Sequence, residues 1–209
     1  AYALLARNHA VPPSGPGYDA AMSKWRELSH DSVYIWGYNA DFKNFILPTP
    51  TFWNLGPELR DYKKRNVRGV GHQLPWGSLS DFVYLRCWLF AKLAWNPDQD
   101  ENALIAEWID GTCGAGAPDV LAYVALLKKA VGRKEVWITA YDKSVRHWMT
   151  PEDILEAREL FAHAAAATAG DPRANAWIRK LSASVIMATI VEYSRVSAYA
   201  AEKTVALPS

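Results

Sequence analysis

Apolar and polar positions follow two different patterns along the chain. In the first 80 residues, segments with helical spacing alternate with short apolar runs. Residues 19–30 place Ala21, Met22, Trp25 and Leu28 at helical spacing, which predicts a short amphipathic helix. Residues 33–38, VYIWGY, form a β-branched and aromatic run, which predicts a strand.

A second helix and strand follow the same order. Gly56-Pro57 opens the segment PELRDYKKR, which reads as a helix, and residues 66–71, NVRGVG, predict another short strand. This alternation is typical of parallel βα units, in which ligands bind at the carboxyl ends of the strands. Those ends are residues 36–39 and 71–74, and the loop that follows brings Trp76.

From Leu79 onward the pattern is helical throughout. Residues 81–95 are apolar on nearly every face and predict a buried helix that Asn96-Pro97 ends. Asp98 and Glu101 have the spacing of a capping box before the helix 103–110. Residues 111–116 read as a flexible connection. Three further helices begin at Pro118, Thr150-Pro151 and Asp171-Pro172, the last running to about residue 204.

Composition excludes several classes of protein. The 209 residues are half apolar, and 23 basic residues against 22 acidic ones give a net charge of +1. Disorder and electrostatic binding of nucleic acid are therefore not expected, and no apolar run reaches the roughly 20 residues that span a bilayer. Two cysteines, five unpaired histidines and no phosphate-binding glycine motif predict no disulfide scaffold, no metal site and no cofactor.

Tryptophan is over-represented, with 10 residues against 6 phenylalanines. Trp88, Trp95, Trp108 and Trp177 fall on helical stripes and are expected in the core. Trp36, Trp53 and Trp76 fall in or beside the strand-end loops. With Tyr38 they either stack on sugar rings or pack in the core.

Polar candidates at the strand ends are few. His72 is either a ligand contact or a structural histidine, and it stands beside Gln73. The nearest carboxylates, Asp41 and Asp81, are expected in a solvated loop and at a helix amino terminus. The pair of strand-end carboxylates common in glycosidases is absent.

Two stretches carry a family resemblance. They begin YIWGYNADFKNFILPTPTFWNLG and DFVYLRCWLFAKLAWNPDQD, and AKLAWNPDQD spans Ala91–Asp100. They resemble the latter part of a bacterial family of large secreted carbohydrate-active proteins, formerly catalogued as a domain of unknown function. Its characterised members are endo-β-N-acetylglucosaminidases with a (β/α)8 barrel related to that of the β-hexosaminidases.

The resemblance implies a fold and a division of the chain. Residues 1–95 are expected to form the last βα units of a (β/α)8 barrel, an α/β fold. Residues 96–209 are expected to form a helical region packed on the barrel. A complete barrel takes about 250 residues, so the chain reads as a piece of a larger protein. It opens AYALL, with no initiator methionine and no visible signal peptide.

Two positions depart from the family pattern. Gly37 stands where the family has the acidic residue of WDY, and His72 stands where it has the glutamate of FEQG. The acid/base glutamate of the family lies on an earlier strand without a counterpart here, so no catalytic residue is assigned.

The resemblance also implies a function. We expect a part of a glycoside hydrolase that acts on β-linked N-acetylglucosamine glycans. Its cleft would be lined by Trp36, Tyr38, Asn39, His72, Gln73 and Trp76. Its partners would be the glycan and the rest of the same polypeptide or a complementary chain. The location implied is extracellular or periplasmic. The alternative is a non-catalytic glycan-binding or structural helical module.

Overall fold

The computed structural model describes residues 2–3, 8–30, 32–74, 79–133 and 135–206. A parallel sheet in the order β1-β2-β3 lies near the amino terminus. Its strands are β1 (Tyr2–Ala3), β2 (Tyr34–Tyr38) and β3 (Gly69–Gln73). Helix α1 (Pro16–Leu28) connects β1 to β2. The 3-10 turn η1 (Phe52–Asn54) and helix α2 (Leu55–Lys64) connect β2 to β3.

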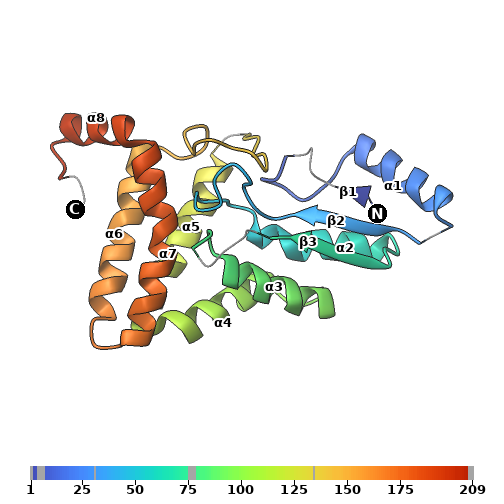
Figure 1. Ribbon diagram of the computed structural model, residues 1–209, viewed down its shortest axis with the longest axis horizontal. Helices are drawn as coiled ribbons and strands as arrows, with labels where there is room; N and C mark the ends of the chain where they lie inside the picture. The colour runs from blue at the N-terminus through green and yellow to red at the C-terminus, as the bar shows by residue number, and fades with distance from the viewer. Residues whose placement is uncertain (1, 4–7, 31, 75–78, 134, 207–209) are drawn as a thin grey trace.

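Helices form the rest of the described chain. They are α3 (Val83–Trp95), α4 (Glu101–Cys113), α5 (Ala117–Gly132), α6 (Pro151–Ala167), α7 (Pro172–Val191) and α8 (Tyr193–Lys203). A 3-10 turn, η2 (Gly114–Gly116), joins α4 to α5 in place of the expected flexible connection. Figure 1 shows the sheet with α1 and α2 at one end of the molecule and the α6–α7 pair at the other.

Among the described helices, α4, α6 and α7 begin at a side chain that accepts hydrogen bonds from the backbone amides of the first turn. Thr150 and Asp153 form a reciprocal capping box at α6, and Asp171 accepts hydrogen bonds from two backbone amides at α7, as their sequences predict. At α4 the predicted cap is wrong by two residues. Asp100, not Asp98, accepts from the amides of Asn102 and Ala103. Asp98 instead pairs with the ammonium group of Lys63.

The expected long helix from Pro172 to about residue 204 is interrupted at Glu192. The Glu192 carboxylate is buried, and it accepts a hydrogen bond from Arg195 at 2.8 Å and lies 3.5 Å from Arg146. The apolar stripe continues through this position and does not reveal the break between α7 and α8.

One buried apolar cluster runs from Ala10 to Val196, so it continues across residue 95. In α3 the stripe of Leu85, Leu89 and Leu93 is fully buried. The expectation that the whole helix is buried is wrong on its other side, because Cys87 is exposed and Trp95 is 92% exposed. Trp88, Trp108 and Trp177 are half-buried.

The predicted fold class is wrong. The described chain is mainly helical, and its sheet has three short strands, one of them only two residues long. It does not form the closing βα units of a (β/α)8 barrel. Local periodicity identified most of the helices and strands but missed β1 and the break between α7 and α8. Closure of a sheet depends on long-range pairing that local periodicity does not encode. No helix among the described residues has the length and apolarity needed to span a membrane.

Candidate functional site

The register of β2 and β3 sorts the candidate residues onto two faces of the sheet. Tyr34, Trp36 and Tyr38 lie opposite Gly69, Gly71 and Gln73, respectively. Because side chains alternate along a strand, these six positions share one face. The intervening positions, Ile35, Gly37, Val70 and His72, belong to the opposite face.

The first of these faces exposes aromatic rings. Tyr34 is 54% exposed and Trp36 is 46% exposed, while Tyr38 is half-buried. The ring of Tyr34 lies over Gly69, since a Cβ atom at that position would be 2.7 Å from its Cδ1 atom. A Cβ atom at Gly71 would be 3.8 Å from the Trp36 ring, an ordinary van der Waals contact. The glycines therefore leave room for the rings to lie across β3 and form a broad apolar surface.

The surface continues past the carboxyl end of β2. The ring of Phe42 lies 5.7 Å from that of Tyr38 and 5.8 Å from that of Tyr141, centroid to centroid. Tyr141 is exposed, and its segment is tied to the Phe42 loop by a 2.7 Å hydrogen bond from the Phe42 amide to the Ala140 carbonyl. We call this set the aromatic strip: Tyr34, Trp36, Tyr38, Phe42 and Tyr141.

Sequence reasoning did not include Phe42 or Tyr141 among the site residues. Tyr141 lies in a segment without regular secondary structure, about a hundred positions after Tyr38. No local signal links the two. Phe42 stands out in the sequence only as part of the stretch that carries the family resemblance.

His72 lies on the opposite face, away from the aromatic strip. Its imidazole packs on the Phe90 ring of α3, with centroids 4.8 Å apart. It also occupies the space beside Gly37, because a Cβ atom there would be 2.6 Å from the Nε2 atom of His72. The structure therefore does not bring His72 together with Trp36, Tyr38 and Gln73.

Asn39 is a buried anchor. Its Oδ1 atom accepts hydrogen bonds from the hydroxyl of Thr51 and from Arg86, both at 2.7 Å. Arg86 is fully buried and also pairs with Asp81 at 2.6 Å. The guanidinium also donates a hydrogen bond to the Thr49 carbonyl. This network joins the end of β2 to α3, so Asn39 and Asp81 have structural roles, and Asp81 is not a simple helix-terminal residue.

Asp41 is the carboxylate nearest to the end of β2. It is buried rather than solvated, with 4% exposure, and burial raises its pKa to about 6 even though the backbone amides of Lys43 and Asn44 donate to it. Asp142 adds to this increase through like charge. A carboxyl group enclosed in this way can order its loop, but it cannot reach a ligand on the surface.

Other sequence candidates lie elsewhere. Trp53 contacts Lys128 of α5 through a cation–π interaction of 5.6 Å, and Trp76 falls outside the described residues. No group of three or more His, Cys, Asp or Glu side chains that could hold a metal ion occurs in the part of the chain that the structure describes.

Residues 5–125, more than half of the chain, match a family described as Domain of unknown function (DUF4838). The chain belongs to the DUF4838 family. The DUF4838 region includes β2, β3 and all of the aromatic strip except Tyr141, and it ends within α5. Comparisons with curated proteins and with solved structures give no significant match.

Proposed function

We propose that this DUF4838 chain binds glycans through the aromatic strip and serves as the sugar-recognition part of a carbohydrate-active protein. The observation that carries the proposal is the row of Tyr34, Trp36 and Tyr38 on one exposed face, with two glycines opposite. Large flat rings with a polar handle suit the apolar faces of pyranoses. Gln73, opposite Tyr38, supplies amide donors and an acceptor for hydroxyl groups.

The resemblance described above suggests the sugar. Its characterised members act on β-linked N-acetylglucosamine, so we propose oligosaccharides of this sugar as ligands and an extracellular or periplasmic location. Hydrolysis requires at least one well-placed carboxylic acid. The strands β1, β2 and β3 carry no Asp or Glu, and Asp41 is enclosed. A hydrolytic role therefore depends on an acid supplied from outside these elements.

The test is a calorimetric titration of the full chain with chitotriose. Because the aromatic strip offers only a few rings, we expect a dissociation constant of the order of 1 mM. This corresponds to a binding free energy of about −4 kcal/mol. Trp36→Ala should abolish measurable binding. Trp95→Ala is the matched control, since it removes an indole that is 92% exposed on α3.

Two results would count against the proposal. One is an absence of heat with every β-linked amino-sugar oligosaccharide while the chain is folded. The other is equal weakening by Trp36→Ala and Trp95→Ala, which would indicate non-specific contact with exposed indoles. The chain alone should release no reducing sugar, whereas release would assign catalysis to residues within it.

A further inference from the structure

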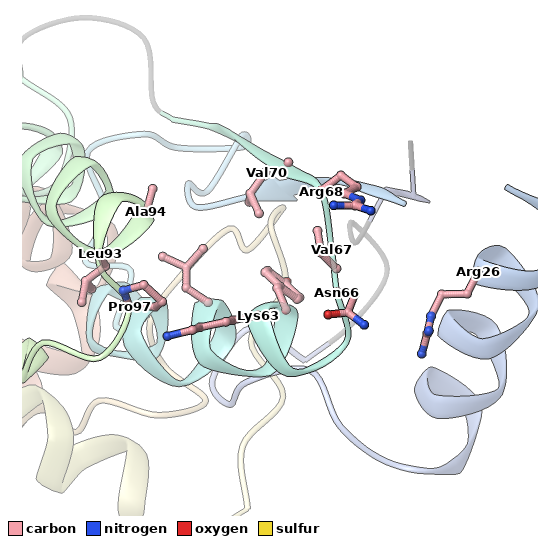
Figure 2. A pocket seen from close by; sticks show the side chains of 12 residues that line it. Arg26, Lys63, Asn66, Val67, Arg68, Val70, Leu93, Ala94 and Pro97 are labelled. Atoms are coloured by element: carbon pink, nitrogen blue, oxygen red, sulfur yellow. The ribbon is translucent and has the colours of Figure 1, made fainter. Parts of the chain in front are cut away.

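A second site candidate lies away from the aromatic strip. A pocket of about 750 Å³ opens between the carboxyl-terminal parts of α2 and α3 and the start of β3, with α1 facing it (Figure 2). The volume is within the usual range of small-molecule sites. Gly69 and Val70 line it, so it lies at the amino end of β3, whereas Tyr38 and Gln73 mark the carboxyl ends of their strands.

One part of the pocket is basic. Its lining includes Arg26, Asn66 and Arg68, whereas the Lys63 side chain extends toward Pro97 at the other end of the pocket (Figure 2). The pocket lining includes no Asp or Glu among the described residues. Figure 2 shows Asn66 and Arg68 in the segment between α2 and β3, with Arg26 reaching out from α1. Lys63 pairs with nearby Asp98. Within the described ranges, the side chains of Asn66 and Arg68 form no hydrogen bond or ion pair.

The other part of the pocket is apolar. Val70 of β3, Leu93 and Ala94 of α3, and Pro97 line the end nearer to α3 (Figure 2). Leu59 and Val67 complete the apolar lining. A ligand that fits both parts has a negative group at one end and an apolar body at the other.

We infer that this pocket binds a small organic anion with an apolar body. Arg68 and Asn66 hold the carboxylate or phosphate group, because a guanidinium forms paired, charge-assisted hydrogen bonds to such oxygens. Val70, Ala94 and Pro97 take the apolar body out of water. The site shares no side chain with the aromatic strip, although Gly69, over which the Tyr34 ring lies, also lines the pocket.

The polar part is tested with octanoate and octyl phosphate as probes, measured by calorimetry on the full chain. Arg68→Ala should weaken both about tenfold, as expected for the loss of a charged hydrogen bond. Lys64→Ala is the matched control, because it removes one exposed positive charge from α2 outside the pocket lining. Asn66 has a φ of +56°, so Asn66→Gly removes the amide without backbone strain and should weaken binding several-fold.

The apolar part is tested by varying the length of the probe's alkyl chain and by a substitution that fills this end of the pocket. Butyrate should bind at least tenfold more weakly than octanoate, because each buried methylene contributes to affinity. Ala94 is exposed, so Ala94→Phe is tolerated by the fold and should block octanoate. Octyltrimethylammonium should not bind. Chitotriose should not compete with octanoate, so failure of the glycan proposal leaves this one standing.

Three outcomes would overturn the inference. Equal weakening by Arg68→Ala and Lys64→Ala would mean that only the general positive field attracts the anion. Equal binding of octanoate and octyltrimethylammonium would mean an unselective apolar surface. If neither octanoate nor octyl phosphate binds the folded chain, the pocket is not a site for this class of ligand.

Discussion

Gly37 and His72 lie directly opposite each other in the β2–β3 ladder, and the imidazole fills the space that a side chain at residue 37 would need. These are the two positions expected from the sequence to depart from the WDY and FEQG patterns. The register shows that the departures are neighbours in space. The absence of a side chain at residue 37 makes room for the imidazole of His72. That ring in turn packs on the Phe90 ring of α3.

The first prediction follows from this contact. Gly37→Ala places a Cβ atom 2.6 Å from the Nε2 atom of His72, so the ring must move away from its place on Phe90. We expect a loss of about 1–3 kcal/mol in the free energy of unfolding, measured by urea denaturation. In a His72→Ala background the same change should cost about 1 kcal/mol less, because the clash is gone. Additive effects of the two substitutions would contradict this coupling.

Local features of the fold were predictable from the sequence. The caps at Thr150 and Asp171 depend on side chains within three residues of the helix start, and both are observed. The strand at β2 follows from its β-branched and aromatic run. The sequence places Trp95 on a helical apolar stripe and predicts it in the core. That prediction is wrong, because Trp95 lies two positions after Leu93 and falls off the buried stripe.

The candidate site was predicted only in part. Trp36 and Tyr38 share an exposed face as their spacing of two implies, and Gln73 joins them through the register. His72 and Gln73 are consecutive in one strand, so they cannot point to the same face. The sequence could not predict that Tyr141 belongs to the site. Its segment is joined to Phe42 by a long-range hydrogen bond and not by a local pattern. The expected barrel came from the family resemblance, and the three short strands that the structure describes do not support it.

The second prediction concerns the buried guanidinium of Arg86. It holds the Asn39 side chain, the Thr49 carbonyl and the Asp81 carboxylate together. Arg86→Leu leaves the Asp81 charge buried without its partner, which should lower the free energy of unfolding by about 3–5 kcal/mol. Lys24→Ala, which breaks an exposed pair with Glu27, is the control and should cost less than about 0.5 kcal/mol.

The third prediction is a dependence of stability on pH that arises from Asp41. Burial raises its folded pKa to about 6, above the usual value of about 3.9 for an unfolded chain. The folded state therefore binds more protons than the unfolded state between these two values. The Asp41 contribution is most favourable below about pH 4 and is lost as the pH rises through about 6. The loss is about 2–3 kcal/mol.

Asp41→Asn removes this titration while keeping an oxygen that can accept from the amides of Lys43 and Asn44. The variant should gain stability over the natural chain as the pH rises from 4 to 7, measured by urea denaturation at each pH. Asp110→Asn, at an exposed position on α4, is the control for the loss of one carboxylate from the chain. A difference that stays constant with pH for Asp41→Asn would contradict a raised pKa in the folded state.

The last prediction uses the two glycines beneath the aromatic strip. Neither has a left-handed φ, so alanine is compatible with the backbone at both positions. Gly69→Ala puts a methyl group 2.7 Å from the Tyr34 ring and must turn that exposed ring off the sheet, whereas Gly71→Ala meets the Trp36 ring at an ordinary 3.8 Å. If a flat row of rings binds the sugar, Gly69→Ala should weaken chitotriose binding about three- to tenfold, the equivalent of one weakened aromatic contact. Gly71→Ala should change it less than about twofold. An equal effect of the two substitutions would mean that the position of the Tyr34 ring does not contribute to binding.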